Sequence, residues 1–521
     1  MKQQIISVQE LKKHNKKDSL WIQIGENIYD LTKFIDFHPG GKAVLLEYGG
    51  MNATEDFLQF HQPIWLQKYE KFIVGQIQKD QQEQKSLVAP PIRQFKQENN
   101  QMFGDLIPFG DSNSIQGYQQ RYYTQNHLEF RKKCREFVQK NIEPYIEEWE
   151  NKSKTPVELI KILGENGVIS LCIGFPFWFK KFGSQKVFGV ELENPDSFHE
   201  VIFYDEFSRV GSGGILWGLL GMPMFGLPPI LKFGNQDLQD RIGTPCLKGE
   251  KIICLAITEP WAGSDVANLK TTAKRTEDGK FFIVNGMKKF ITNGIFCDYF
   301  TTAVQSEKGM TMLVIEKNLP GVKTRHMKCT GMWSSGTSFV VFENVKVPVE
   351  NIIGKEGNGF KQTLLNFNHE RFMFLQQANR LSRVCYEESM KYAHLRKTFG
   401  KKLIEQPVIR QKLAKMIAQI ESTQAWLEQI AYNIDKMSQE QQIKILSGNI
   451  AMCKAHASQV LEFCANQAVQ IVGGKGYTRG GHSSKIERIY REIKAMAIPG
   501  GSEEVLLDLG TRNASKIYPS L

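Results

Sequence analysis

The chain has 521 residues, of which 41% are hydrophobic and 23% charged, and its 66 basic and 55 acidic residues give a formal net charge of +11. This balance is typical of folded protein and excludes disorder, collagen and fibrous repeats as the main state, while the length corresponds to about three domains. Nine scattered cysteines without a C-x-x-C pair exclude a disulfide framework and a structural zinc site, so we expect a reducing compartment.

Targeting signals are weak. No run of eighteen apolar residues predicts a membrane span, and the first residues lack a signal-peptide core and an Arg- and Ser-rich leader. The C-terminal Leu521 follows Ser520, whereas the peroxisomal S-K-L signal has a basic residue there. We expect a soluble intracellular protein, with the cytoplasm favoured and the mitochondrion and peroxisome as alternatives.

The charge is unevenly distributed. Residues 1–79 hold ten lysines, no arginine and nine acidic residues, so their net charge is +1 and the rest of the chain carries +10. Such an excess attracts nucleic acid, anionic membranes or polyanionic small molecules. Because no nucleic-acid-binding motif accompanies it, we favour a polyanionic small molecule.

Five segments follow one another along the chain. Residues 1–79 alternate short β-like runs with short helical stretches, and residues 80–124, rich in Gln, Lys and Glu around Ala89-Pro90-Pro91, are typical of a linker. As a flexible coil, about 45 residues would span roughly 35 to 40 Å. Residues 125–251 have helical periodicity, 252–354 have β-like runs bounded by Gly, Asn and Pro, and 355–521 are again helical.

Two histidines in the first segment are candidate iron ligands. His38 opens His38-Pro39-Gly40-Gly41, and His61 follows 23 residues later. Two imidazoles can fill both axial positions of haem iron, which leaves no open position and favours electron transfer over oxygen binding. Pro39 and the two glycines permit the sharp turn that an inward-facing ligand needs.

The surrounding motifs strengthen this reading. Trp21-Ile22, Tyr29 to Phe34, the HPGG motif and Asn52 to Phe57 occur in the order and spacing of the cytochrome b5 family. Residues 5–79 therefore resemble a complete b5 domain, and the resemblance implies haem b with His38 and His61 as axial ligands. The segment lacks the strong acidity and the membrane tail of free b5 proteins, which suits a module whose redox partner is on the same chain.

The larger part carries a second set of ordered motifs. A Gly/Ser-containing segment, Ala256 to Asp265, lets the backbone approach a planar cofactor and offers hydroxyl donors. It is followed by the segments 285–294, 331–337, 341–348, 351–360, 396–401, 470–477 and 499–504. Their order resembles the acyl-CoA dehydrogenase family over residues 126–515, which implies a helical N-terminal domain, a β middle domain and a C-terminal helical bundle.

The resemblance also implies residue roles. It places Ile257, Thr258, Phe290 and Thr292 at the isoalloxazine ring of FAD and Ser264 near the pyrophosphate. Four further positions match residues that reach the FAD of a neighbouring subunit, so a homo-oligomer, dimer or tetramer, is implied: Arg396, Phe399, Gln470 and Gly474. Phe290 stands where many relatives have Trp, and Trp261 and Asn268 replace smaller residues, so Trp261 could narrow access to the pocket.

The catalytic base has moved relative to many family members. Oxidation of an acyl thioester needs a carboxylate to take the α-proton while hydride leaves the β-carbon. The residue that matches the usual glutamate is Gly500, which cannot take a proton but offers its N–H to the thioester oxygen. The long-chain and isovaleryl branch carries the base before an arginine on a helix, and Glu370-Arg371 matches that place. Glu370 is therefore the predicted base, with Glu503 and Glu504 as fallbacks.

Together these features predict an FAD-dependent acyl-CoA dehydrogenase, which converts an acyl-CoA to a trans-2-enoyl-CoA as in fatty acid β-oxidation and whose fused b5 haem passes electrons. Candidate partners are the acyl-CoA, an electron-transferring flavoprotein and a b5 redox partner. Two alternatives stay open: an acyl-CoA oxidase that uses oxygen, and a non-enzymatic haem module on an inactive dehydrogenase scaffold.

Overall fold

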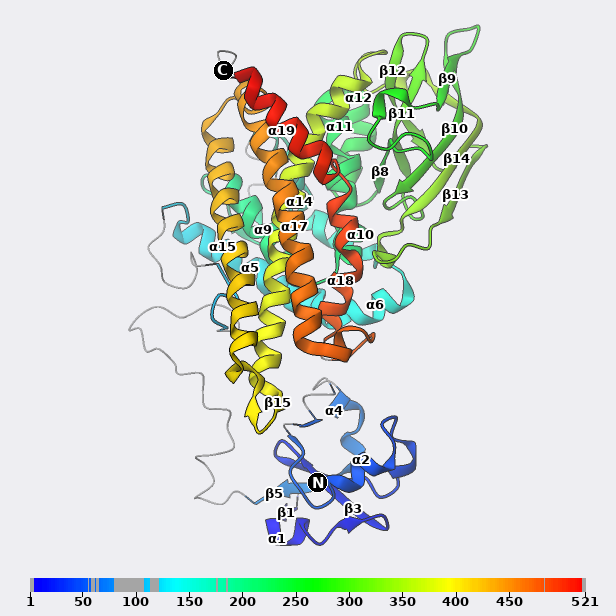
Figure 1. Cartoon of the computed structure of the whole chain (residues 1–521). Helices are drawn as coiled ribbons and strands as arrows, with labels where there is room; N and C mark the ends of the chain where they lie inside the picture. The colour runs from blue at the N-terminus through cyan, green and yellow to red at the C-terminus, as the bar shows by residue number, and fades with distance from the viewer. Residues whose placement is uncertain are drawn as a thin grey trace.

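The computed structural model describes residues 4–54, 56–57, 61, 65–78, 107–112, 121–174, 177–183, 186–481 and 483–517. They form a small N-terminal domain and a larger body, and the small domain lies beyond one end of the long helices of the body (Figure 1). The body combines helices from two parts of the chain with one large sheet, drawn green at the upper right. The predicted order, a small α+β domain followed by helices, sheet and helices, is confirmed.

A five-stranded sheet organises the small domain. Leu20, Ile22 and Ile24 alternate along one strand and therefore lie on one face, where they join a core with Tyr29 and Ile35. The order across the sheet is β1 (Ile5–Ile6), β5 (Ile73–Ile77), β4 (Asn27–Asp30), β3 (Ser19–Ile24) and β2 (Asn15–Lys16). The helices are α1 (Val8–Leu11), α2 (Lys42–Glu47) and α4 (Trp65–Lys68).

Part of the predicted linker is buried in the body. Most of residues 80–124 lies outside the described residues, but residues 107–112 are described and Gly110, Asp111 and Ser112 are buried. Asp111 accepts hydrogen bonds from Arg135 and Arg209, both at 2.9 Å. Burial alone would raise the pKa of this carboxyl, but the arginines lower it below its ordinary value. Residues 107–112 therefore belong to the body.

The N-terminal helices of the body surround a buried centre, in which all residues of Ser197–Ser208 and Gly213–Gly221 are buried. They are α5 (Gln125–Asn141), α6 (Ile146–Lys152), α7 (Glu158–Glu165), α8 (Phe177–Phe182), α9 (Ser197–Ser208), α10 (Gly213–Gly221), α11 (Pro228–Phe233), α12 (Gln236–Leu238) and α13 (Thr244–Leu247). Within the described residues one stretch, Gly213–Phe233, has the length and mean hydropathy of a membrane span, and its most hydrophobic 18-residue window is entirely buried inside the body. A core helix of a globular domain meets the same criteria, and here α10 and α11 fill the space between sheet and bundle.

The middle part of the chain forms a seven-stranded sheet, in which β8 pairs with β11 outside the main path. The main order is β12 (Gly309–Glu316), β11 (Tyr299–Ser306), β9 (Thr272–Arg275), β10 (Phe281–Ile291), β14 (Ser338–Pro348) and β13 (Val322–His326), with β8 at Ile253–Ala256. The register of β10 against β14 shifts between Lys288 and Ile291, and Phe290 within this irregularity has φ +62°. The shift re-aims the end of β10.

Long helices complete the body. α14 (Gly359–Leu395), α15 (Pro407–Lys436) and α17 (Ser447–Val472) run side by side (Figure 1), followed by α18 (Ser484–Ala497) and α19 (Glu503–Ile517), and α16 (Gln439–Gln441) is one short turn. Small buried side chains allow α17 to pack closely: Ala451, Ala455, Ala457, Ala465 and Ala468. Between α14 and α15 a hairpin of β15 (Lys397–Thr398) and β16 (Lys401–Lys402) projects from the end of the bundle.

Candidate functional site

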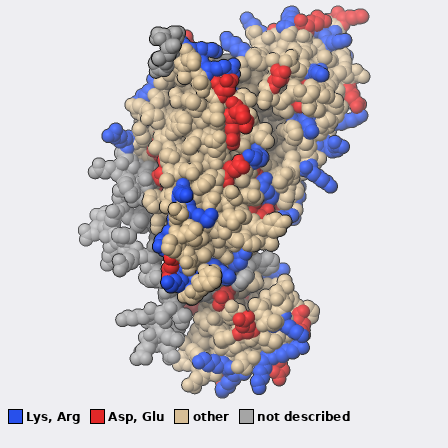
Figure 2. Space-filling view, viewed as in Figure 1, with Lys and Arg blue, Asp and Glu red and all other residues tan. Residues whose placement is uncertain are grey.

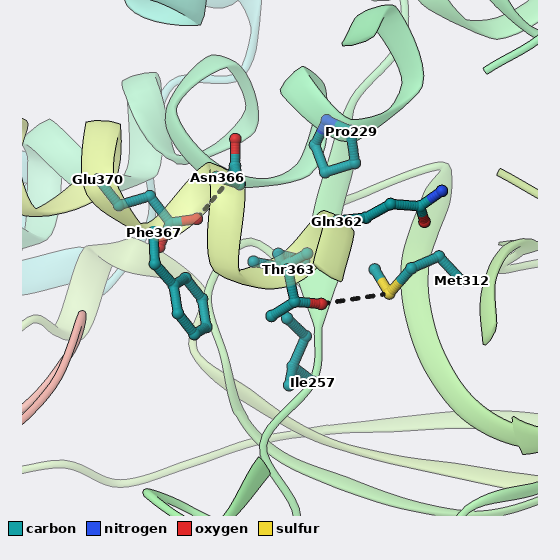
Figure 3. A pocket seen from close by; sticks show the side chains of 9 residues that line it. Pro229, Ile257, Met312, Gln362, Thr363, Asn366, Phe367 and Glu370 are labelled. Atoms are coloured by element: carbon teal, nitrogen blue, oxygen red, sulfur yellow. Dashed lines mark hydrogen bonds between the residues drawn. The ribbon is translucent and has the colours of Figure 1, made fainter. Parts of the chain in front are cut away.

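A narrow hollow lies where the sheet meets the helices. Its lining comes from α11, β8, β12 and α14, namely Pro229, Leu255, Ile257, Met312, Gln362, Thr363, Asn366, Phe367 and Glu370 (Figure 3). Ile257 follows β8 directly and belongs to the predicted flavin segment, whereas Glu370, the predicted base, lies early in α14. The fold therefore brings residues from two separate motifs to one hollow.

Glu370 is held in an environment that opposes its charge. The residue is only 4% exposed, and Asn366, one turn earlier on α14, donates a 2.5 Å hydrogen bond from Nδ2 to its Oε1. Burial raises the pKa of the carboxyl to about 8, although Asn366, Arg371 and Lys232 act in the opposite direction. A pKa near the operating pH is what a general base needs.

Gly500 lies beside this helix, in the turn between α18 and α19. Its φ is +72°, and a Cβ at this position would be 3.1 Å from Cδ2 of Phe374. Arg371 donates from Nε to the carbonyl oxygen of Gly500 at 2.7 Å. Within the described residues the Gly500 N–H has no protein acceptor, so it is available to a ligand oxygen.

Lys454 supports the same turn and is a residue that the sequence did not single out. Its Nζ donates to the carbonyl oxygens of Ala497, at 2.5 Å, and Gly501, at 3.0 Å. Burial lowers the pKa of the ammonium to about 7, while Glu503 acts in the opposite direction. The backbone around Gly500 is thus fixed from two sides, by Arg371 and by Lys454.

The fallback bases do not share the hollow. Glu503 and Glu504 begin α19, outside the lining residues, and Glu504 is exposed. Trp261 also lies outside the lining: its Nε1 donates to Glu259 at 2.6 Å, and the residue is 45% exposed. The predicted narrowing by Trp261 therefore does not apply to this hollow; Asn268 is exposed and donates to Asp265.

The predicted flavin contacts lie along the end of β8 and the end of β10. Ile257 is buried, Thr258 and Thr292 are half-buried, and Phe290 is 56% exposed. The side-chain hydroxyls of Thr258, Thr292 and the exposed Ser264 make no hydrogen bond to any described residue, so three donors are unused. Unused hydroxyls beside apolar surface fit the polar edge and flat face of a flavin, so these residues could hold FAD.

A buried ion pair holds the two flavin segments together. Lys288, on β10, donates from Nζ to the carbonyl of Ile257 and to Glu259, both at 2.9 Å. The Glu259 carboxylate also accepts hydrogen bonds from the N–H and the hydroxyl of Thr271. Both side chains of the pair are inaccessible to solvent. Such a pair is stable because further hydrogen bonds compensate for desolvation, and it fixes Ile257 against β10.

The other predicted FAD contacts lie far from the hollow. Arg396 and Phe399 follow the C-terminal end of α14, while Gln470 and Gly474 lie at the end of α17 and just beyond it. Glu370 and Arg396 are 26 residues apart in the sequence, and at 1.5 Å per residue that corresponds to roughly 40 Å along α14. Phe399 is 97% exposed. These four residues therefore do not join the hollow of their own chain.

The two predicted iron ligands face each other in the small domain. The ring centroids of His38 and His61 are 5.9 Å apart. Nδ1 of His61 lies 3.3 Å from the carbonyl oxygen of Phe57, and because a carbonyl only accepts, Nδ1 carries the proton and Nε2 is left as the ligand atom. Nδ1 of His38 is buried without a partner in the described residues. Burial also lowers the pKa of His61, which favours the neutral, metal-binding form.

Apolar side chains surround this pair. Phe57 stacks on His61 with ring centroids 4.5 Å apart, and Phe34 meets His38 edge-on. The core beside them includes Val44, Leu45, Leu46, Leu66 and Phe72. Two opposed imidazoles in an apolar setting fit a six-coordinate haem. Lysines are mixed with Asp and Glu on the visible face of this domain, as its net charge of +1 implies (Figure 2).

Comparison with known families matches the small domain and all three parts of the larger body. Residues 7–78 match the model of the cytochrome b5-like heme/steroid binding domain. Residues 124–250, 254–345 and 357–515 match the N-terminal, middle and C-terminal domains of acyl-CoA dehydrogenases. The acyl-CoA dehydrogenase family binds FAD and the b5-like domain binds haem, in agreement with the two sites described above.

Individual relatives agree. Acyl-CoA dehydrogenase apdG of Emericella nidulans is 39% identical over 79% of this chain and 96% of its own length. Acyl-CoA dehydrogenase AFT10-1 of Alternaria alternata is 33% identical over 80% of this chain and 97% of its own. Among solved structures, a probable acyl CoA dehydrogenase from Mycobacterium abscessus is 31% identical, with a TM-score of 0.68, and covers 76% of this chain and all of its own.

Proposed function

The chain belongs to the acyl-CoA dehydrogenase family and carries a cytochrome b5-like domain ahead of it, and from this premise we propose that it oxidises an acyl-CoA to the trans-2-enoyl-CoA with Glu370 as the base. The observation that carries the proposal is the hollow shared by Ile257 and Glu370. A hydride acceptor at Ile257 and a proton acceptor at Glu370 can then act on neighbouring carbons of one substrate.

Each residue has a defined task. FAD bound along Ile257, Thr258, Phe290 and Thr292 supplies the hydride acceptor. The Glu370 carboxylate takes the α-proton as hydride leaves the β-carbon, so the substrate loses two electrons and two hydrogens. The N–H of Gly500 donates to the thioester oxygen, which gains negative charge as the α-proton leaves. Arg371 keeps Gly500 beside the base helix through its 2.7 Å hydrogen bond.

We also propose a homo-oligomer. Arg396, Phe399, Gln470 and Gly474 lie roughly 40 Å along the bundle from Glu370. They can contact FAD only if they reach the cofactor of another subunit. The exposure of Phe399, at 97%, supports a partner surface at this end of the bundle.

The small domain is proposed to receive the electrons. Haem held by His38 and His61 supplies a one-electron acceptor on the same chain. Two imidazole ligands would leave the haem no open position for oxygen. The chain between Gln78 and Ile107 limits the reach of the domain to roughly 100 Å, since a fully extended residue spans about 3.5 Å. This reach is long enough for the haem domain to approach the flavin site of the same molecule.

An anaerobic titration of the protein loaded with FAD and haem tests this function. Acyl-CoA should first bleach the flavin and then reduce the haem, at a rate independent of protein concentration. Haem that stays oxidised after complete flavin reduction would contradict electron transfer from flavin to haem. A rate of haem reduction that rises with protein concentration would point to transfer between molecules or to an external acceptor.

The alternatives give different outcomes. Hydrogen peroxide formed in proportion to substrate in air would indicate an acyl-CoA oxidase. Flavin that no acyl-CoA bleaches would indicate a haem module on an inactive scaffold.

A further inference from the structure

The Glu370 carboxyl has one hydrogen-bond partner among the described residues, the side chain of Asn366. The Asn366 amide donates from Nδ2 to Oε1 of the carboxyl across 2.5 Å (Figure 3). The two residues are four positions apart on α14, so their side chains lie on the same face of the helix, and both line the hollow. The other carboxyl oxygen, Oε2, makes no hydrogen bond to any described residue.

The amide of Asn366 is devoted to this one hydrogen bond. The residue is 2% exposed, and its Oδ1 is buried without a partner among the described residues. Because a carboxylate only accepts hydrogen bonds, Nδ2 rather than Oδ1 must face Glu370 when the base is ionised. A buried amide oxygen without a partner costs free energy. Since a leucine of similar shape would avoid that cost, the bond to the base accounts for an amide at this position.

The arginine that follows the base does not replace this bond. Arg371 donates from Nε to the carbonyl oxygen of Gly500 at 2.7 Å and from Nη1 to Oδ1 of Asn368 at 3.0 Å. Within the part of the chain that the structure describes, its guanidinium forms no ion pair with Glu370 within 4 Å. Arg371 therefore fixes the Gly500 turn and not the orientation of the carboxyl.

The other charged groups around Glu370 are not bonded to it either. Glu200, on α9, pairs with His369 at 2.8 Å, and Lys232, on α11, forms no ion pair within 4 Å with a described residue. The strands β8 and β12 contribute no charged side chain to the lining. Burial raises the pKa of Glu370 to about 8, and the hydrogen bond from the amide opposes this rise more than either nearby cation does.

We propose that Asn366 is a positioning residue for the base, which holds Oε1 of Glu370 and leaves Oε2 to take the α-proton. The inference rests on the proposed function for the role of Glu370. In that reaction the α-proton forms an O–H bond at Oε2, and the electron pair of the broken C–H bond forms the new double bond as hydride leaves the β-carbon for the flavin. The Asn366 bond persists throughout, because Oε1 stays an acceptor whether or not Oε2 carries a proton.

The pH dependence of anaerobic flavin bleaching is the first test. Asn366→Leu keeps the shape and removes the donor. Because a hydrogen bond to a carboxylate is about twice as strong as one to a neutral group, the pH midpoint of bleaching should rise by about one unit, and bleaching at pH 7 should slow about tenfold. Asn366→Asp should raise the midpoint further, since two neighbouring carboxyls share one proton.

Gln362→Met is the matched control. Gln362 lines the same hollow from the same helix, but its Nε2 donates to the carbonyl oxygen of Ile353 at 3.0 Å and not to the base. The pH midpoint of bleaching should therefore be the same in Gln362→Met as in the unmodified protein. A merely structural role of Asn366 would lower the rate without moving this midpoint.

A second measurement needs no turnover. The stability of the protein relative to its Glu370→Gln form falls as pH rises from the pKa of the unfolded carboxyl to that of the folded one, and then levels off. When Asn366→Leu is present in both proteins of the pair, this levelling should occur about one pH unit higher. Thermal unfolding of the FAD-loaded proteins from pH 5 to 10 measures the difference.

The outcomes separate this inference from the proposed function. If the stability curves level off at the same pH with and without Asn366→Leu, or if Gln362→Met shifts the bleaching midpoint equally, the proposal is overturned. Asn366→Asp, which keeps the size and polarity of the side chain, decides the matter if Asn366→Leu does not fold. Flavin that no acyl-CoA bleaches would contradict the proposed function, whereas the stability curves would still show whether Asn366 holds the Glu370 carboxylate.

Discussion

Arg371 donates from Nε to the carbonyl oxygen of Gly500 across 2.7 Å, although the two residues are 129 positions apart in the sequence. The hydrogen bond joins the residue after the proposed base to the residue that replaces the usual base of the family. If Glu370 is the base, as we propose, this hydrogen bond keeps the backbone N–H at position 500 beside the base helix.

The first prediction concerns Gly500→Ala. The methyl group would require φ near +72° and would lie 3.1 and 3.2 Å from two atoms of Phe374, so we expect a loss of about 1–3 kcal/mol in unfolding free energy and slower turnover. Gly279→Ala is the matched control, because Gly279 has φ +68° and no atom within 4 Å of a Cβ. Equal melting temperatures for the two variants would show that the Phe374 contact is unimportant.

The second prediction concerns stability and pH. Burial raises the pKa of Glu370 to about 8, well above the ordinary value near 4.3, so the folded protein holds a proton that the unfolded chain releases. The stability of the FAD-loaded protein should therefore fall relative to Glu370→Gln as pH rises from 5 to 8, by up to about 1.4 kcal/mol per pH unit. Thermal unfolding across this range measures the difference.

The matched control for that experiment is Glu129→Gln, at an exposed position of α5. The melting temperature of this variant should change with pH in the same way as that of the unmodified protein. If the curves for Glu370→Gln and Glu129→Gln have the same pH dependence, the carboxyl at 370 is not buried as described.

The third prediction tests the buried segment at residues 107–112. Asp111→Asn removes a buried negative charge between Arg135 and Arg209, although Arg135 keeps its ion pair with Glu206, so we expect a loss of about 1–3 kcal/mol. Because the pKa of Asp111 is lowered, its contribution should decrease as pH falls below about 4 and vanish only below the lowered pKa. Denaturant unfolding measures the loss, and Asp240→Asn, at an exposed position, should be near neutral. Similar midpoints for both variants would mean that the segment does not stabilise the body.

The fourth prediction concerns the haem ligands. His38→Ala and His61→Ala should each abolish the six-coordinate haem spectrum, because each removes one of the two opposed imidazoles. His14→Gln should keep the spectrum, because the His14 ring is hydrogen-bonded to the Ser19 hydroxyl and stacks on Trp21, and is not one of the two opposed imidazoles. Flavin content should be unchanged in all three variants. An unaltered haem spectrum in either alanine variant removes that histidine from the ligand set.

Much of this architecture could be predicted from sequence because short local motifs identify both domains. The HPGG turn and the spacing to His61 were sufficient for the b5 resemblance, and ordered segments from 256 to 504 were sufficient for the dehydrogenase fold, both of which the family comparison confirms. Site roles such as that of Glu370 stay predictions.

The parts that sequence reasoning missed are buried charges. Asp111 lies within a polar stretch that looks like linker, and its partners are 24 and 98 positions away. Lys288 has the residue type of an ordinary surface lysine, because lysines are seldom fully buried. Alternation along β10 was the one available signal, since it places Lys288 on the same face as Val284 and Phe282, which are buried.

The most direct test of Glu370 as the base is a rapid-mixing measurement of flavin bleaching without oxygen. The unmodified protein should bleach on addition of its acyl-CoA, at a rate that rises with pH through about 8 as the carboxyl loses its proton. Glu370→Gln should bind FAD and acyl-CoA but bleach about 10²- to 10⁴-fold more slowly. Near-normal bleaching in Glu370→Gln, with loss in Glu503→Gln or Glu504→Gln, would contradict the account.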